Sequence, residues 1–299
     1  MLPATREGVE LFNARTTNWS VCPCPTRAFA ELVHPGLDGG DAVELLWQQV
    51  ADVCRLDEPD PVAAWTSRLD ALQASAATLG ERRFATIHFE GSGTDISIGL
   101  LPSSRWISAR LSTVDGIVHV PNLPTEEVFT TPDPARVDGV VRATKPLFVA
   151  GALVEGLKVR FEGGRAVQID ADHGAETVRA LAGRDEGAER LGEVAIVDRD
   201  GRIGSMETVF FDTLLDENAA SHIALGQGFE FAVDDADKHA VNSSQIHIDF
   251  MIGGDHAAGS SAGRDRQPPD FGAELPMESA PADSTGALGL AGQERCRSG

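Results

Sequence analysis

The sequence predicts an α+β fold in which a mostly antiparallel sheet, curling toward a barrel, follows a helical N-terminal part. Before Arg82, apolar residues recur every three or four positions, whereas after it they alternate with polar ones. Two alternating stretches, residues 82–101 and 157–170, are each interrupted by a glycine turn, which is typical of hairpins. From Gly254 onward the chain contains no Val and no Ile, so we expect no packed structure there.

These observations divide the chain into three predicted domains: a mixed, mainly helical part, a sheet-rich part that carries the candidate site, and a disordered tail, at residues 1–80, 81–253 and 254–299. In the first part, residues 41–56 and 60–79 have the apolar spacing of amphipathic helices. Asp60 is suited to cap the second of them, Pro61 suits its first turn, and Gly80 is expected to end it.

The second part alternates strands with short helices. We expect strands in the two hairpins and at residues 106–111, 117–120, 193–198 and 245–252, and helices at residues 175–182 and 186–191.

Charge and composition exclude several classes of function. The formal net charge of −21 would repel nucleic acid and anionic membranes, so we expect neither as a partner. No run of about 18 apolar residues is present, and the N-terminal residues lack a signal-peptide pattern. The four cysteines have neither zinc-site nor disulfide-framework spacing. We therefore expect reduced thiols and a cytoplasmic location.

A stretch of acids, amides and one imidazole, TLLDENAASHIALGQGF at residues 213–229, is the strongest local signal for chemistry. Asn218 is a good helix N-cap, and the Ala/Ile/Leu run after it predicts a helix that begins there. His222 would then lie one turn on, where the carboxylate of Glu217 could meet it and a divalent metal could accept both. The alternative is an ordinary capped helix with one buried, hydrogen-bonded histidine.

Further acids and one more histidine extend this signal. Glu126 and Glu127 stand together in a predicted loop, and Glu193 opens a predicted strand. His247 and Asp249 are two positions apart on another strand and therefore share a face, where buried charge is costly unless it is paired or metal-bound. Each also has a simpler explanation. Glu126 and Glu127 could lie in a solvated loop, and Glu193 could lie at the surface. His247 and Asp249 could form a buried pair.

Four segments together resemble the aminopeptidase T / aminopeptidase S family of metallo-exopeptidases. In chain order these segments are NLPTEEVFTTPD, LGEVAIVD, FFDTLLDENAASHIALGQ and NSSQIHIDFMIG. The resemblance covers roughly residues 10–253 and implies a metallo-aminopeptidase that removes N-terminal residues from peptides, in which a homodimer is possible.

The resemblance also implies a set of site residues. It assigns two divalent ions, with zinc, cobalt or manganese as candidates, to six ligands: Glu127, Glu193, Glu217, His222, His247 and Asp249. Of these, Glu127 and Glu193 are the expected catalytic carboxylates, the second of them as a bridge between the ions. Where the family has a catalytic tyrosine, seven residues after the histidine, this chain has Phe229, and it contains no Tyr at all.

Two other departures from the family pattern concern the ends of the chain. Residues 1–80 are expected to be a remnant of an N-terminal α/β domain, and the tail is expected to replace a closing strand. These departures leave two hypotheses open: an active two-metal aminopeptidase, or a truncated, weak or inactive paralogue that acts as a binding or assembly partner.

Overall fold

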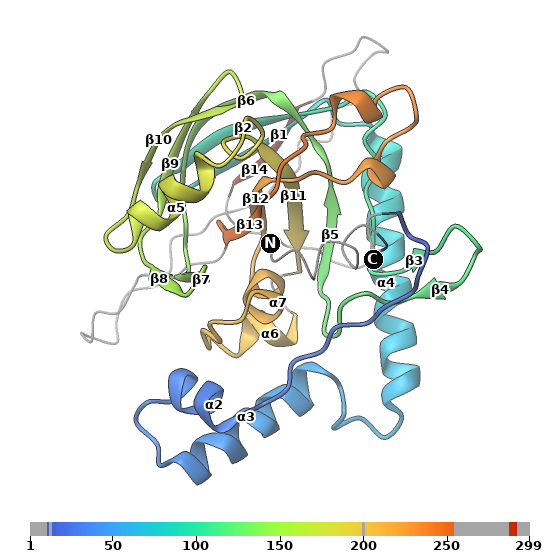
Figure 1. The fold of residues 1–299 in the computed structure, drawn as a ribbon. Coiled ribbons are helices and arrows are strands. Elements are labelled where there is room, and N and C mark those ends of the chain that lie inside the picture. Colours follow the sequence, from blue (N-terminus) through green and yellow to red (C-terminus); the bar gives the residue numbers. More distant parts are fainter. Residues whose placement is uncertain (1–10, 12–13, 199–200, 254–286, 292–299) are drawn as a thin grey trace.

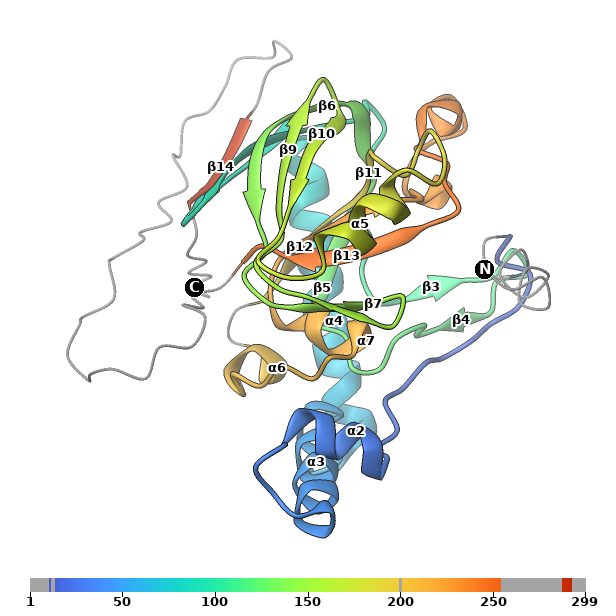
Figure 2. The same cartoon turned by 60° about the vertical axis from the view of Figure 1, so that its left-hand side comes forward.

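The computed structural model describes residue 11 and residues 14–198, 201–253 and 287–291 (Figure 1). Its N-terminal part is helical, with α2 at Arg27–Val33, α3 at Gly39–Val53 and α4 at Pro61–Arg82. The first two helices lie together at one end of the molecule, and α4 runs from there along the side of the sheets (Figures 1 and 2). No described helix combines the length and apolar character that a membrane crossing requires.

The two predicted helices, residues 41–56 and 60–79, are confirmed as α3 and α4. Asp60 caps α4 by accepting a hydrogen bond from the Ala63 N–H, and Pro61 is its first residue, as expected. The expected end at Gly80 is wrong, because α4 continues to Arg82 and ends where Arg83 adopts the left-handed conformation, with φ of 46°.

A six-stranded sheet forms the larger part of the second region. Its order is β10-β9-β6-β2-β1-β14, and all neighbours are antiparallel except the parallel pair β1 and β14. The strands span Thr86–Gly91 (β1), Thr94–Leu100 (β2), Pro132–Arg142 (β6), Lys158–Glu162 (β9), Arg165–Asp170 (β10) and Ala287–Ala291 (β14). Both predicted hairpins are confirmed, as β1–β2 and β9–β10.

A second, four-stranded antiparallel sheet has the order β13-β12-β11-β5. Its strands are Glu127–Thr130 (β5), Leu191–Val197 (β11), His222–Gly226 (β12) and His247–Met251 (β13). In Figure 2 it runs beneath the six-stranded sheet. The two sheets contribute to one hydrophobic core, in which Ile87 and Phe161 of the larger sheet lie in the same cluster as Val194 and Phe250 of the smaller one.

Short elements complete the described part of the chain. They are β3 (Leu111–Ser112), β4 (Val118–His119), β7 (Leu147–Val149), β8 (Ala152–Val154), α5 (Ala175–Ala182), α6 (Arg202–Ser205), α7 (Thr213–Asp216) and the 3-10 turns η1 (Glu217–Ala219), η2 (Glu230–Ala232) and η3 (Lys238–Ala240).

Three predictions about these elements are corrected by the structure. The sheet does not curl into a barrel: neither large sheet closes on itself within the described residues. The stretch 186–190 forms turns rather than a helix, since Leu191 already begins a strand. The expected strand at 106–111 is reduced to a single bridge between Ile107 and Phe129, followed by the two-residue β3.

The helix expected from Asn218 is also wrong. α7 ends at Asp216 and is capped by Asp212, and the Ala/Ile/Leu run becomes β12. Every residue of β12 is buried, because β11 and β13 flank it. A strand that is covered on both faces carries the same continuous apolar sequence as a buried helix, and the tertiary context overrides the helix propensity of alanine and leucine.

The predicted domain boundaries stay predictions, but the packing bears on them. Leu69, Leu72 and Ala76 of α4 belong to the same cluster as the sheets, so α4 is part of the main core. Most of the expected tail lies outside the described residues; within it, 287–291 form β14 beside β1, whereas we expected no regular structure there.

A second core joins α2 and α3 to the segment that carries α6, α7 and η1. Leu46 and Val50 of α3 pack in one cluster with Ile203, Phe210 and Leu215. The N-terminal helices therefore support the loop from which the acidic stretch begins.

We expect Leu46→Ala to lower the free energy of unfolding by about 2–5 kcal/mol, because Leu46 is fully buried and the substitution leaves a cavity. The measurement is chemical denaturation followed by far-UV circular dichroism. Leu32→Ala is the control, since Leu32 stands in α2 with 45% of its surface exposed, and it should change the value by less than about 1 kcal/mol. Equal losses in both variants would contradict the assignment of this second core.

Candidate metal centre

Five of the six predicted ligands lie on one face of the four-stranded sheet, and the strand register explains why. Glu193 of β11 pairs with Ala224 of β12, which pairs in turn with Asp249 of β13, so these three side chains form one cross-strand row. His222 and His247 stand two positions from Ala224 and Asp249 along their strands and therefore share that face.

Glu127 joins the same face from the other edge of the sheet. It pairs with Val197, four positions after Glu193 on β11, so both point to one side. Two small side chains stand among the ligands on this face: Ala195 lies on β11 between Glu193 and Val197, and Ala224 lies between Glu193 and Asp249 in their cross-strand row. They leave room above the sheet for the longer side chains.

Glu193 is the centre of the resulting cluster. One of its oxygens, Oε2, lies 3.0 Å from His247 Nε2, and the other, Oε1, lies 4.0 Å from His222 Nε2. Each imidazole also faces a second carboxylate: His222 Nε2 is 3.2 Å from Glu127 Oε2, and His247 Nε2 is 3.2 Å from Asp249 Oδ1. The cluster thus contains two triplets of candidate ligand atoms that share one glutamate, Glu127–Glu193–His222 and Glu193–His247–Asp249.

Both imidazoles are oriented by backbone carbonyls. His222 Nδ1 lies 3.3 Å from the Ala220 carbonyl oxygen, and His247 Nδ1 lies 2.8 Å from that of Gln227. Because a carbonyl only accepts, each Nδ1 carries the proton and donates it. The Nε2 atoms are left to face the carboxylates, which is the arrangement that holds a histidine ready to bind a metal through Nε2.

Two buried carboxylate oxygens without hydrogen bonds also indicate that these ligands suit divalent cations. Glu127 Oε2 and Asp249 Oδ1 are buried and make no hydrogen bond, although each faces an imidazole nitrogen at 3.2 Å. A lone pair on carboxylate oxygen and a lone pair on Nε2 repel each other unless a proton or a cation lies between them. Mixed carboxylate and imidazole ligands are those that zinc, cobalt and manganese accept.

The pKa shifts of the clustered side chains reflect the same excess of negative charge. Burial alone would lower the pKa of His222, but the facing carboxylates, Glu127 above all, outweigh it and raise the pKa to about 10. For His247, burial is likewise outweighed by Asp249 and Glu193, and its pKa is raised well above the ordinary value. Burial raises the pKa of Glu193 as well. Positive charge is therefore strongly favoured here, either as protons or as metal ions.

Glu217, the sixth predicted ligand, lies at the margin of the cluster. It belongs to neither triplet of close ligand atoms among the described residues. Burial raises the pKa of its carboxyl group well above the ordinary value, and the charges of Asp249 and Glu127 raise it further, so Glu217 lies near enough to these acids to interact with their charges. It reaches that position from η1 rather than from the start of a helix.

Phe229 also lies at the cluster. It follows the strand β12, which begins at His222, and not a helix from Asn218. Its N–H donates to Thr131 Oγ1 at 2.8 Å, and its ring packs against His247 and Phe129, with centroids 5.3 and 5.2 Å away.

Glu126 and Asn218, which were not among the predicted site residues, fix the backbone beside the ligands. Glu126, expected in a solvated loop, is fully buried, with Arg55 Nη2 at 2.9 Å from Oε1 and Arg68 paired to Oε2. Asn218 Oδ1 accepts the Glu126 N–H at 2.7 Å, and Asn218 Nδ2 donates to the Leu214 carbonyl. Asn218 thus ties the loop before Glu127 to the turn that carries Glu217.

The only sequence signals for these two residues were indirect. Each stands directly beside a predicted ligand, Glu126 before Glu127 and Asn218 after Glu217. Nothing in the local pattern pairs them with Arg55, in the turn after α3, or with Arg68, in α4.

We expect Asn218→Ala to weaken the binding of Zn²⁺ by about tenfold or more, because the buried Glu126 N–H loses its acceptor and the two ligand-bearing segments lose their link. The measurement is calorimetric titration of the ion-free protein. Asn242→Ala is the matched control, since Asn242 is also buried and donates to backbone carbonyls, of Gly187 and Gly226. If both variants weaken binding equally, Asn218 serves the fold alone.

Comparison with known proteins adds independent evidence. Residues 3–267 match the model of the thermophilic metalloprotease (M29) family. The chain is 47% identical to aminopeptidase T of Thermus aquaticus over 243 residues, which are 79% of this chain and 60% of that protein. It is 38% identical to aminopeptidase PepS of Streptococcus thermophilus, over 79% of this chain and 59% of the relative.

A solved structure gives the same result for the fold. Wild-type AmpT from Thermus thermophilus superposes with a TM-score of 0.77 at 44% identity, covering 84% of this chain and 62% of that one. The chain therefore spans about three fifths of the length of the relatives that it matches. With the family model matching most of its length, the chain belongs to the thermophilic metalloprotease (M29) family.

Proposed function

We propose that this chain is a metal-dependent aminopeptidase that releases N-terminal amino acids from peptides with the help of two divalent ions, zinc, cobalt or manganese. The observation that carries the proposal is the position of Glu193, which presents one carboxylate oxygen toward each of the two imidazoles. A carboxylate shared between two sets of ligands is suited to bridge two ions. The names of the relatives, which are aminopeptidases, support the reaction.

Each ligand has a role in this proposal. Glu127 and His222 would hold one ion, His247 and Asp249 the other, with Glu193 between them and Glu217 completing the set from the margin. When bound, two such ions polarise the scissile carbonyl and lower the pKa of a shared water toward 7. Four carboxylates against two imidazoles offset much of the charge of two dications.

The chain itself contributes position and exclusion of solvent. The Ala220 and Gln227 carbonyls fix both histidine rings, and Glu126 with its two arginines fixes the peptide before Glu127. Glu127 and Glu193 are the proposed catalytic carboxylates because both are buried and both face His222. Low solvent access strengthens the attraction of these carboxylates for a bound cation.

We also propose that the protein acts in the cytoplasm on peptides, without nucleic acid as a partner, and that a homodimer is a possible assembly. The net charge of −21 supports the exclusion of nucleic acid, because the protein would repel its phosphates.

Ion stoichiometry tests the bridging role of Glu193. We expect the wild type to bind two equivalents of Zn²⁺, His247→Ala to retain about one, and Glu193→Gln to weaken both sites by more than about tenfold. Glu230→Gln, at an exposed position next to Phe229, is the control and should bind like the wild type. Removal of the ions with a chelator should abolish hydrolysis of L-leucine p-nitroanilide. A Glu193→Gln variant that loses only one ion would exclude a bridge.

Phe229 tests the catalytic part of the proposal. Phe fills the volume of Tyr but donates no hydrogen bond, and its ring already packs on His247. We expect Phe229→Tyr to raise the turnover number on L-leucine p-nitroanilide by about ten- to a thousandfold, because a phenol can stabilise the developing oxyanion. Zinc affinity should stay unchanged.

Other outcomes at this position have defined meanings. If the wild type and Phe229→Tyr both bind two ions and both are inert, the alternative of a non-catalytic binding partner is favoured. If the wild type already turns over rapidly and the variant gains nothing, a phenol has no role in this chain.

A further inference from the structure

An aromatic surface adjoins the ligand cluster. Phe129 stands two positions after Glu127 on β5 and pairs with Ala195 of β11, so its side chain points to the face that carries the ligands. The rings of Phe229 and Phe231 pack on it, with centroids 5.2 and 6.3 Å from the Phe129 centroid. All three residues are half-buried. A set of rings that the fold leaves partly uncovered beside the ligands offers apolar surface to a bound peptide.

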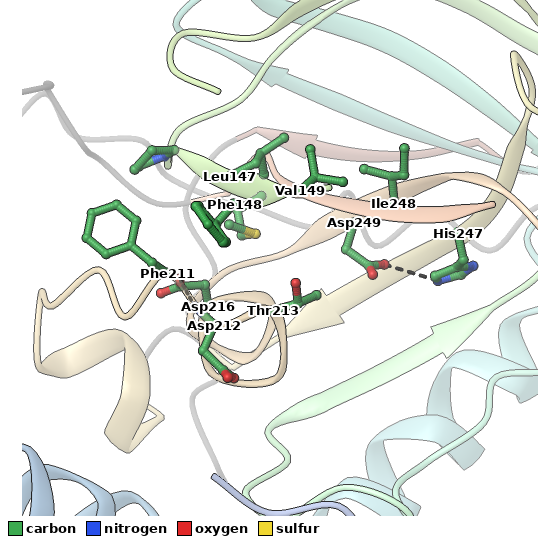
Figure 3. A pocket seen from close by; sticks show the side chains of 12 residues that line it. Leu147, Phe148, Val149, Phe211, Asp212, Thr213, Asp216, His247, Ile248 and Asp249 are labelled. Carbon is green, nitrogen blue, oxygen red and sulfur yellow. Dashed lines mark hydrogen bonds and ion pairs between the residues drawn. The ribbon is translucent and has the colours of Figure 1, made fainter. Parts of the chain in front are cut away.

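This surface lies apart from the pocket that borders His247 and Asp249. Figure 3 shows that pocket, with these two residues at one side of it and Phe148 and Phe211 toward the other. The three rings of the aromatic surface do not line it. Phe229 nevertheless contacts His247, with ring centroids 5.3 Å apart. The aromatic surface is therefore a second place at which a peptide held by the ions can be contacted.

Arg105 fixes the loop that carries Phe231. Its Nη2 donates to the Phe231 carbonyl at 3.1 Å and to the Val233 carbonyl at 2.9 Å. Its backbone N–H donates to the Ala232 carbonyl at 2.8 Å, and its Nη1 forms an ion pair with Asp234. One arginine thus holds four consecutive residues, which gives the ring of Phe231 a defined position before any ligand binds.

Arg15 places a cation over this surface. Its guanidinium carbon lies 5.6 Å from the centroid of the Phe231 ring, which is the separation of a cation–π contact. Its φ is 52°, in the left-handed region that residues other than glycine rarely adopt, and its carbonyl accepts the Val114 N–H at 2.9 Å. A strained residue that the surrounding structure fixes in this way is a sign of function at that position.

The charge of Arg15 is not compensated by the fold. In the part of the chain that the structure describes, no carboxylate forms an ion pair with Arg15, whereas Arg55 and Arg68 are both paired with Glu126. The formal net charge of −21 opposes the approach of an anion, so a cation without a carboxylate partner is the feature that can hold one here. Every unmodified peptide carries such an anion, its C-terminal carboxylate, which a guanidinium can bind through two hydrogen bonds.

The distance from the ligands to Arg15 corresponds to a short peptide. The His247 and Phe229 ring centroids are 5.3 Å apart, the Phe229 and Phe231 centroids are 5.3 Å apart, and the guanidinium lies 5.6 Å beyond. The direct distance is shorter than this path. Because an extended peptide advances about 3.3–3.6 Å per residue, about three or four residues span it.

We propose that the aromatic surface of Phe129, Phe229 and Phe231 receives the part of the peptide that follows the scissile bond, and that Arg15 binds its C-terminal carboxylate. The substrate class is then short peptides with a free carboxylate. This inference rests on the aminopeptidase function proposed above. A longer chain would carry its carboxylate past Arg15, and an amide in place of the carboxylate would lose the charge-assisted hydrogen bonds.

The test uses peptides that begin with a β-amino-α-hydroxy acid, of which bestatin is the two-residue member. Their amine and hydroxyl groups bind a divalent ion, so affinity is measured without turnover. Members of two to five residues, each as the free acid and as the C-terminal amide, are titrated by calorimetry into the full chain loaded with Zn²⁺. At about three or four residues we expect the acid to bind about tenfold more tightly than the amide, with a smaller difference at the other lengths.

Four variants assign the preference to Arg15. Arg15→Gln should remove it, and Arg15→Lys, which keeps the charge, should retain part of it. Gln and Lys meet the same positive φ as Arg, so both variants change the head group and not the backbone. Phe231→Ala should lower the preference, because the guanidinium loses the ring beneath it. Arg27→Gln is the matched control: Arg27 pairs with Glu31 within α2, 74% of its side-chain surface is exposed, and the variant should keep the full preference.

The outcomes separate this proposal from the one on which it depends. Acids and amides that bind equally at every length, or a preference that survives Arg15→Gln, would overturn the role of Arg15 even if the protein hydrolyses peptides. A preference that is lost in Arg15→Gln and partly kept in Arg15→Lys, without any hydrolysis of peptides, would support the carboxylate site and overturn the catalytic function. Absence of all binding, together with absence of hydrolysis, would overturn both.

Discussion

The burial of several carboxylates around Glu193 is the constraint on which the rest of this structure depends. Like charges in a low dielectric are unfavourable unless cations lie among them, and at this cluster the only cationic side chains in contact among the described residues are the two histidines. The sheet brings five of the six predicted ligands together because alternate residues of its strands point to the same face, and Ala195 and Ala224 stand among them. The helices and the second core then hold the segment from which Glu217 enters.

Glu126 and Glu127 illustrate how one chain treats two adjacent buried acids in opposite ways. Glu126 is neutralised by the guanidinium groups of Arg55 and Arg68, and these ion pairs fix the backbone at this position. Arg55 itself has a φ of 58°, so strain is accepted to bring it there. The second acid receives no arginine and keeps an unbonded oxygen toward His222. Structural and functional acids are therefore distinguished by their partners rather than by their sequence.

This difference sets the limit of what the sequence could predict. The pair His247 and Asp249 was found because a period of two on an apolar strand is visible in one segment, and the hairpins and the long helices were found for the same reason. Long-range pairing is not visible in that way: Arg55 and Glu126 are 71 positions apart, and their contact follows from the fold. The helix expected from Asn218 failed because alanine and leucine fit a buried strand as well as a helix, and only the neighbours β11 and β13 decide between them.

The correction at that segment has a functional meaning. Asp216 accepts the N–H groups on both sides of Phe211, and Asn218 accepts the Glu126 N–H. Glu217 lies near enough to Asp249 and Glu127 to interact with their charges, and His222 begins β12. A regular helix repeats its directions every three to four residues, so Asp216, Glu217 and Asn218 would point along a fixed spiral about 100° apart. A short helix, a 3-10 turn and a strand in succession release each side chain from that spiral. This irregularity lets one stretch both fix the backbone around it and contribute to the ligand cluster.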